Sequence, residues 1–314
     1  MDVFKGSDIN KEYRMIATIG MFDGVHLGHQ SLLKGLKEEA EKSGLKSAVV
    51  TFITHPQKLF RPNDGLHMIM TLENRLKYLG EMGVDAVILM DFTAELSKMT
   101  SIDFMRLLKT QYGVEKLMVG FNHRFGHGEN EYFDDYASFG REIGVEVLRA
   151  KEYQGAYSPV SSSLIRKVIE EGKVDLAMSY LTRPFELSGV VVHGFKNGRK
   201  IGYPTANIDL TDDLIMPHRG VYAVKAELEN GEIYDGMANI GVRPTVIKDG
   251  LRTFEVNLFD FDGDLYDQRL KVRFVKFMRS EMKMGSLDEL KNRLSMDKES
   301  CKETLRAYDM KKYI

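Results

Sequence analysis

The chain has 314 residues, of which 43% are hydrophobic and 29% charged, and its formal net charge at pH 7 is −2. This length favours two domains, and the near-neutral charge offers no overall field for nucleic acid or anionic lipid, so neither partner is expected. The longest aliphatic run, 86–90, is far shorter than the roughly twenty residues of a membrane helix, and the first residues lack the apolar core of a signal peptide. Cys301 is the only cysteine, which excludes intrachain disulfides and CxxC chemistry and makes a cytoplasmic location the expectation.

The first half of the chain alternates short apolar segments with amphipathic helical patterns. Strands are expected at 15–19, 48–52, 86–90 and 116–119, and helices at about 29–42, 72–79 and 104–108. Gly44 is expected to end the first of these helices. Continuous apolar strands separated by helices predict a parallel sheet covered on both faces.

The pattern changes after about residue 180. A helical stretch at 164–181, which carries an internal Gly172, is followed by short β-branched and aromatic runs. Asn-Gly or Asp-Gly pairs, which favour hairpin turns, separate these runs at 197–198, 230–231, 249–250 and 262–263. We therefore expect a small all-β module, a barrel or a sandwich, with a domain boundary that leaves domains of 1–183 and 184–314. Ser286 and Glu289 form a capping box that predicts a C-terminal helix.

A glycine-rich segment at 20–29 lies between an expected strand and an expected helix. Backbone N–H groups and the helix dipole favour an anion there, so a phosphate site is the main prediction. His26 and His29 fall near one face of the first helical turn and could donate hydrogen bonds to phosphate oxygens. A metal site on these two histidines and an inert helix start are the alternatives. The further candidates for phosphate binding in this segment are Gly20, Phe22, Asp23, Gly24 and Gly28.

Three other segments could complete a site at the same sheet edge. His55 and Pro56 follow a strand, as a ligand-lining loop would, and Asn122 and Arg124 follow the strand ending at Val119. A third segment has three consecutive hydroxyl side chains at the start of a helix, followed by an arginine one turn later, a pattern that suits a triphosphate. From the spacing alone, plain N-capping is the favoured interpretation of the serines. The candidates in this segment are Ser162, Ser163 and Arg166.

The second domain opens with a basic, glycine-rich hairpin that could close over phosphates or could be a solvated surface. Thr205 and Asn207, two apart on an extended chain, point to one side and offer oxygen ligands that suit Mg²⁺. Glu255 lies in an apolar strand, and its spacing does not decide whether it faces inward or toward solvent. A calcium loop at 260–271 is excluded because Leu265 and Lys271 stand where glycine and glutamate are needed. The hairpin candidates are Gly194, Lys196, Gly198, Arg199, Gly202 and Pro204.

Three motifs of the first half resemble the prokaryotic FAD synthetases of the nucleotidyltransferase superfamily. They are GMFDGVHLGH at 20–29, GFNHRFG at 120–126 and VSSSLIR at 160–166. The resemblance implies an α/β Rossmann-like domain that joins ATP to FMN, giving FAD and pyrophosphate, with His26, His29 and Arg166 stabilising charge and with His55 and Pro56 near the flavin. The sequence departs from the family pattern at Met21, His123, Glu129 and Glu131, which puts the adenylyl-transfer half in question.

The second half resembles the riboflavin kinase module through GxxxxGxxxGRxxGxPTxNI, GVYAV, NIGVRPT, FEVNLFDFDGDLY and MRSEMKM, in that order. The resemblance implies a small antiparallel β-barrel domain with a C-terminal helix. It implies that Thr205 and Asn207 bind the Mg²⁺ of ATP and that Glu255 is the general base for riboflavin. Arg279 and Glu281 are carried over as flavin contacts.

The two modules together resemble the bifunctional riboflavin kinase/FMN adenylyltransferase family over nearly the whole chain. The expected substrates are riboflavin, FMN and ATP, and the expected metal is Mg²⁺. Two alternatives are a riboflavin kinase with a degenerate first domain and a non-catalytic flavin-binding regulator that contacts RNA. The oligomeric state and the channelling of FMN are left open.

Overall fold

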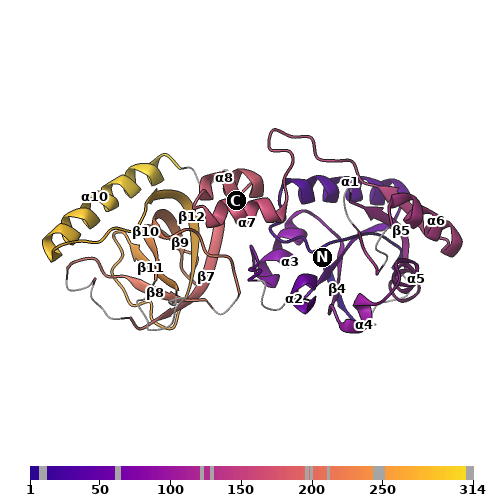
Figure 1. Ribbon diagram of the computed structural model, residues 1–314, viewed down its shortest axis with the longest axis horizontal. Coiled ribbons are helices and arrows are strands. Elements are labelled where there is room, and N and C mark those ends of the chain that lie inside the picture. The colour runs from indigo at the N-terminus through magenta and orange to yellow at the C-terminus, as the bar shows by residue number, and fades with distance from the viewer. Residues whose placement is uncertain are drawn as a thin grey trace. The chain divides into compact units, whose positions relative to one another are not determined.

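The computed structural model of the chain contains two compact units, Met1–Leu66 with Thr71–Val160 and His67–Met70 with Ser161–Ile314. The structure describes residues 1–6, 13–60, 65–120, 124–127, 131–194, 198, 201–210, 213–242 and 252–308. Figure 1 labels the elements of both units. Residues 161–183 belong to the second compact unit. The expected boundary between the two functional modules, at 183/184, stays a prediction.

The first unit is built on a parallel sheet with the strand order β1-β4-β3-β2-β5-β6. The parallel sheet confirms the expected Rossmann-like architecture. The edge strands β1 and β6 were not predicted, because both are short and partly exposed and lack a continuous apolar run. The strands are β1 (Asp2–Lys5), β2 (Met15–Ile19), β3 (Lys46–Phe52), β4 (Ala86–Met90), β5 (Val114–Val119) and β6 (Glu146–Arg149).

Helices cover both faces of this sheet. Phe104 and Leu108 of α5 and Tyr136 of α6 join a core made by alternate strand residues on one face. The helix α1 contacts β2 and β3 through the other face and ends at Gly44, whose φ of 65° closes the helix as expected. The helices of the unit are α1 (Leu27–Ser43), α2 (Pro56–Phe60), α3 (Leu72–Glu81), α4 (Ala94–Ser97), α5 (Ser101–Tyr112) and α6 (Phe133–Ile143).

The second unit contains a closed antiparallel barrel with the strand order β10-β11-β8-β7-β12-β9, as the resemblance implied. Its interior is filled by aromatic rings, since Phe274 packs against Phe185, Tyr222 and Phe254 at centroid distances of 5.7, 5.3 and 5.7 Å. Alternate residues of each strand therefore face outward. The strands are β7 (Phe185–Val192), β8 (Ala206–Asp209), β9 (Gly220–Glu227), β10 (Ile233–Val242), β11 (Arg252–Leu258) and β12 (Arg269–Arg279).

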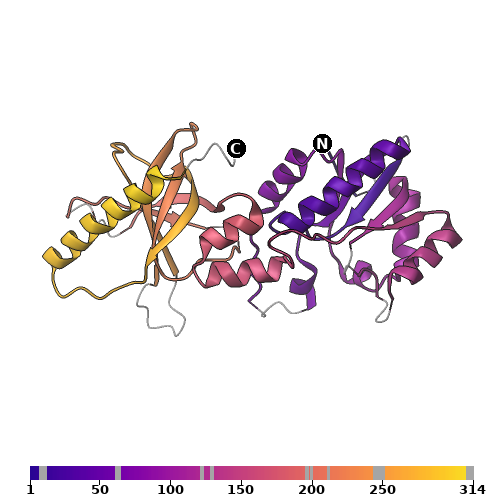
Figure 2. The same cartoon turned by 90° about the horizontal axis from the view of Figure 1, so that it is seen from above.

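The helices α7, α8 and α10 accompany the barrel in the part of the unit that the structure describes. The stretch expected as one helix at 164–181 is two, α7 (Ser162–Glu170) and α8 (Val174–Leu181), because Gly172 takes a φ of 80° that a helix cannot continue. The C-terminal helix α10 (Leu287–Arg306) lies along the outside of β9 and β10, where Cys301 and Leu305 are buried (Figure 2). Ser286 accepts the N–H of Glu289, but the Glu289 carboxylate accepts from Gly285, so only half of the expected capping box forms.

The hairpin signals of the second half have different outcomes. Gly231, with a φ of 86°, lies in the turn that joins β9 to β10, as predicted. The tight turn expected at 262–263 is wrong, since the connection between β11 and β12 runs from residue 259 to residue 268. The pair 249–250 and Asn197 lie outside the described residues.

Candidate active sites

The turn between β2 and α1 has an unusual backbone. Phe22, Gly24 and Val25 take φ values of 51°, 90° and 38°, so three of four consecutive residues lie in the left-handed region. The Phe22 side chain is buried, and a Cβ at Gly20 would lie 3.0 Å from its ring. Asp23 is also buried. The chain therefore makes a tight turn directly before α1, next to a helix N-terminus, where an anion is favoured.

The two histidines of this segment lie together, as predicted. The His26 and His29 rings stack with centroids 3.7 Å apart. His26 is the N-cap residue of α1, and its Nδ1 accepts the N–H groups of Gly28 and His29 at 3.2 and 3.4 Å. An accepting Nδ1 carries no proton, so the proton of the neutral ring is on Nε2, which can donate to a bound oxygen. Within the described ranges, no third His, Cys, Asp or Glu joins this pair in a group that could hold a metal ion.

The loop after β5 contains Glu131, one of the two acids at which the sequence departs from the FAD synthetase pattern. The Glu131 carboxylate accepts a hydrogen bond from the Ser101 hydroxyl, which also contacts the carbonyl of Phe125 at 2.8 Å. Ser101 is the first residue of α5, where a negative charge is favourable. Glu131 thus anchors the loop. Arg124 is exposed with its guanidinium 4.6 Å from the Tyr132 ring, while Asn122, His123 and Glu129 lie outside the described residues.

His55 and Pro56 follow β3, the strand beside β2 in the sheet. Pro56 is the first residue of α2, and His55 Nδ1 accepts the N–H of Gln57 at 3.1 Å. In a parallel sheet, the loops that follow neighbouring strands meet at one edge. The segment therefore lies at the same sheet edge as the β2–α1 turn.

The serines and the arginine of the third segment lie on α7, in the other compact unit. Ser161 is the N-cap residue and accepts the N–H of Leu164 at 3.2 Å. Capping accounts for Ser161 but not for Ser162 and Ser163. Arg166 Nε donates to the carbonyl of His67 at 2.9 Å, within the same unit.

The barrel carries a second group of polar residues on its outer wall. In the strand register, Glu255 of β11 lies opposite Asn207 of β8 on one side and opposite Asn239 of β10 on the other. Its neighbours Phe254 and Val256 are buried in the barrel, so Glu255 faces outward and is half-buried. Residue spacing did not decide whether Glu255 faces inward or outward. The pleat of the barrel strands decides it, since it places the carboxylate outside the apolar interior.

Thr205 lies next to this carboxylate. Its hydroxyl is 3.3 Å from Glu255 Oε2, and Asn257, two residues after Glu255, donates to the carbonyl of Pro204 at 2.6 Å. A Cβ at Gly194 would lie 2.2 Å from Asn207 Nδ2, so glycine is required where the chain passes the carboxamide. The Thr205 hydroxyl therefore contacts the Glu255 carboxylate, and Asn207 lies opposite Glu255 in the strand register. Hydroxyl, carboxamide and carboxylate oxygens are the ligands that Mg²⁺ prefers.

The glycines of the basic hairpin bring the backbone close to this place. A Cβ at Gly198 would lie 2.2 Å from the carbonyl oxygen of Tyr203, and Gly202 takes a φ of 83°. Both conditions favour glycine, since it has no Cβ and adopts a positive φ readily. Lys196 and Arg199 lie outside the described residues.

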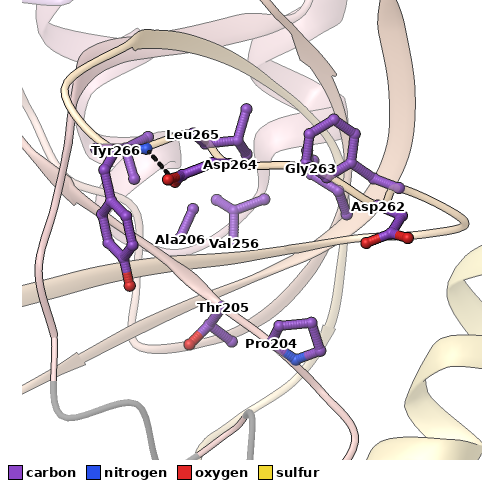
Figure 3. Close-up of a pocket in the computed structure, with 12 residues that line it drawn as sticks. Pro204, Thr205, Ala206, Val256, Asp262, Gly263, Asp264, Leu265 and Tyr266 are labelled. Carbon is purple, nitrogen blue, oxygen red and sulfur yellow. Dashed lines mark hydrogen bonds between the residues drawn. The ribbon is translucent and has the colours of Figure 1, made fainter.

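Two cavities meet at Thr205. The first, of about 360 Å³, opens at the barrel mouth between interior-facing residues and the loop that joins β11 to β12. In Figure 3, Thr205 and Pro204 lie along one side of it, and Tyr266 donates its N–H to Asp264 at 3.0 Å. The second cavity, of about 310 Å³, lies against the outer wall and is lined by Thr205, Glu255 and the start of α10.

Arg279 and Glu281 line the outer-wall cavity. Arg279 Nε lies 2.9 Å from both carboxylate oxygens of Asp297, and Nη2 is 2.5 Å from one of them. Asp297 is 4% exposed. The guanidinium thus fixes α10 to β12 beside the cavity. The sequence analysis did not identify Asp297, because one acid among several on a helix gives no signal of its partner.

Other lining residues were also missed. A tight turn was predicted at 262–263, whereas Phe261, Leu265 and Tyr266 of the 261–266 loop supply an apolar wall to the barrel-mouth cavity. The aromatic residues at both ends of that loop were the signal that could have found it. The apolar wall of the outer cavity comes from Met282, Met284, Leu287, Leu290 and Leu294.

Comparison with known proteins gives a consistent result over both units. A family model described as FAD synthetase matches residues 8–164, and one described as riboflavin kinase matches residues 181–305. Bifunctional riboflavin kinases/FMN adenylyltransferases of Pseudomonas fluorescens and Escherichia coli (strain K12) are each 38% identical to the chain. The matches cover 92% of this chain and 93% and 92% of those proteins. The protein of the same name from Bacillus subtilis (strain 168) is 33% identical, with 92% of both chains covered.

A solved structure shows the same fold. It is a crystal structure from Streptococcus pneumoniae whose protein is named a macrolide-efflux protein, and it is 30% identical to this chain. The two superpose with a TM-score of 0.87 over 96% of this chain and 99% of that one. In the part of the chain that the structure describes, no helix is both long and apolar enough to span a bilayer.

Proposed function

The chain belongs to the bifunctional riboflavin kinase/FMN adenylyltransferase family, and on that premise we propose which residues carry each of its two activities. The enzyme phosphorylates riboflavin with ATP to give FMN, and it transfers AMP from ATP to FMN to give FAD and pyrophosphate. We assign the kinase to the barrel and the adenylyltransferase to the turn between β2 and α1. A cytoplasmic location is part of the same proposal.

The observation that carries the kinase assignment is the position of Thr205. It lines both cavities of the barrel, and its hydroxyl is 3.3 Å from the Glu255 carboxylate. Glu255 lines the outer-wall cavity, so riboflavin belongs there, with its 5′-hydroxyl at the carboxylate. ATP then belongs in the barrel-mouth cavity, with its terminal phosphate reaching Thr205.

Glu255 acts as the general base in this arrangement. It accepts the proton of the ribityl 5′-hydroxyl as that oxygen attacks the γ-phosphorus of ATP, and ADP leaves. An alcohol is a poor nucleophile, and general-base catalysis is worth about 10²–10⁴-fold. Thr205 and Asn207 would hold Mg²⁺, which neutralises phosphate charge when bound. Gly194 and Gly198 let the backbone approach the phosphates.

Adenylyl transfer needs a different kind of site. The nucleophile is the FMN phosphate, which is already ionised near neutral pH, so positioning and charge stabilisation suffice. His26 donates from Nε2, and His29, stacked on it, lies beside the N-terminus of α1. We assign this pair to the α-phosphate of ATP and His55 with Pro56 to the side of FMN. Phosphate binding by Ser162, Ser163 and Arg166, which belong to the other compact unit, stays a prediction from the sequence.

Two observations weigh against a degenerate first domain. The His26 and His29 rings stack at the start of α1, and Glu131 is engaged by Ser101 at the start of α5. A non-catalytic regulator needs no general base, so its function does not account for the contact between Glu255 and Thr205. Both alternatives therefore explain fewer of the described contacts than the bifunctional assignment does.

The test is incubation of the full chain with riboflavin, ATP and Mg²⁺, followed by chromatography of the flavins. We expect FMN to appear first and FAD to follow. Absence of FMN would contradict the kinase assignment. FMN without FAD, even when FMN is supplied in excess, would contradict the adenylyltransferase assignment alone.

A further inference from the structure

An arginine is buried behind the β2–α1 turn. Arg75 lies on α3 and is 1% exposed, which makes it one of the largest fully buried side chains of the protein. Burying a charged group is costly unless it is paired or hydrogen-bonded. Its contacts therefore indicate what the charge is for.

The guanidinium of Arg75 joins the ends of two neighbouring strands. Nη1 donates to the carbonyl of Met21 at 2.9 Å, and Nη2 donates to the carbonyl of Phe52 at 2.6 Å. Met21 follows β2 and directly precedes Phe22, the first residue of the turn with a positive φ. Phe52 is the last residue of β3, three residues before His55.

These contacts fix two functional segments with one rigid group. The planar fork of a guanidinium holds two acceptors in a fixed geometry, which a single ammonium cannot do. The Thr51 hydroxyl also donates to the Met21 carbonyl, at 3.2 Å, so two side chains hold this one carbonyl in place. The turn assigned to ATP and the segment assigned to FMN are thereby held in a constant relation.

Arg75 keeps its positive charge although it is buried. Burial lowers the pKa of Arg75 to about 10, and the nearby Asp23 opposes that shift, so the side chain stays positive at neutral pH. Its Nε makes no hydrogen bond within the described part of the chain. A buried donor without a partner destabilises the fold, and an apolar side chain would pack in this position at a lower free-energy cost.

We propose that Arg75 is a positioning residue for FMN adenylylation. It touches no substrate and acts through the β2–α1 turn and the start of the segment after β3. The inference rests on the proposed adenylyltransferase site. It goes beyond that proposal because it assigns the relative placement of the two substrates to one buried side chain.

The test compares Arg75→Lys with Arg106→Lys in the full chain. Arg106 is a matched control, since it lies on α5 of the same unit with its side chain 48% exposed and paired with Asp103. A displacement of about 1 Å can cost about a hundredfold in rate, so we expect kcat for FMN adenylylation to fall about tenfold to a hundredfold in Arg75→Lys. We expect the riboflavin kinase rate to stay unchanged in both variants, and Arg106→Lys to match the parent in both activities.

A double variant separates positioning from a general loss of structure. If Arg75 acts through the histidine turn, adding Arg75→Lys to His29→Ala should cost much less than it costs the parent, because the two changes affect one unit. Full additivity, with the folded fraction of each variant measured by circular dichroism, would overturn the proposal. An unchanged kcat in folded Arg75→Lys would overturn it as well.

Two other results are informative, namely a variant that does not fold and a parent protein that forms no FAD. If Arg75→Lys does not fold, Arg75→Gln takes its place, since a carboxamide can still donate to one carbonyl. Failure of both variants to fold would assign Arg75 to stability and overturn the positioning role. Absence of FAD formation by the parent would instead contradict the proposed function and is seen before any variant is made.

Discussion

The two proposed phosphate-transfer sites of this chain are built from different structural elements. In the parallel-sheet unit the proposed site is a tight turn and a helix N-terminus, with two stacked histidines as the proposed donors. In the barrel unit the proposed site is a row of side chains from β8 and β11, with Thr205 beside Glu255. The difference follows from the nucleophile, because an FMN phosphate needs only charge stabilisation whereas an alcohol also needs a base.

The contrast also explains how each site is built. A phosphate turn is local in sequence, and its shape depends on positive φ values at Phe22, Gly24 and Val25. The proposed base and the residues proposed to hold Mg²⁺ come from different segments, and the register of the barrel brings Asn207 opposite Glu255. Substitutions should therefore separate the two activities cleanly.

The largest expected effect is that of Glu255→Gln. Loss of the base should lower kcat for riboflavin phosphorylation by at least about a hundredfold, while FMN adenylylation and flavin binding remain. Steady-state rates with riboflavin and with FMN measure the two activities separately. Glu303→Gln, an exposed acid of α10, is the control and should match the parent. A Glu255→Gln protein with full kinase activity would disprove the base assignment.

His29→Ala should lower FMN adenylylation and leave riboflavin phosphorylation unchanged. Removing one preorganised donor to developing charge costs about 10²–10³ in kcat, so FAD formation from FMN should fall by that factor. Phosphorylation of riboflavin should be unaffected. The same pair of assays measures both effects, and a parallel loss of kinase activity in folded protein would show that the sites are not separate.

Asp297→Asn tests how α10 supports the outer-wall cavity. Breaking a buried ion pair by removing one partner costs about 3–5 kcal/mol, and the pairing of Arg279 with Asp297 is of this kind. We expect a lower free energy of unfolding for the second unit and a higher KM for riboflavin. Urea unfolding followed by circular dichroism measures the first, and kinase assays the second. An unchanged stability would mean that Arg279 is held by other contacts.

The smallest expected effect is a pH dependence of barrel stability. Burial raises the pKa of Glu227, but the positive charges of Arg273 and Lys271 outweigh it and hold the pKa below its ordinary value. A depressed pKa stabilises the fold above the ordinary value near pH 4.3, and the gain is lost as the pH falls through the folded-state value. Glu227→Gln should therefore melt at a lower temperature at pH 7, and the difference from the parent should shrink as the pH falls below about 4.3. Melting curves across this range measure it; a constant difference would contradict the linkage.

The features of the two sites that are local in sequence could be predicted, whereas those that depend on strand register or on packing could not. The His26–His29 pair and the start of α1 follow from the spacing of one short segment. The direction of Glu255 did not, because an alternating strand looks the same for either face until the barrel closes. Arg75 gave no signal, since an arginine in an amphipathic helix is usually exposed. The roles of Glu131 and Asp297 likewise depend on partners 30 and 18 residues away.

The most direct test of two separate sites is complementation in a mixture. Glu255→Gln and His29→Ala proteins are each given riboflavin, ATP and Mg²⁺, alone and together, and the flavins are separated by chromatography. We predict little flavin product from Glu255→Gln, FMN alone from His29→Ala, and FAD from the mixture, because FMN released by one variant is the substrate of the other. A mixture that forms no FAD, with both proteins folded, would mean that one substitution abolishes both activities and would contradict the account.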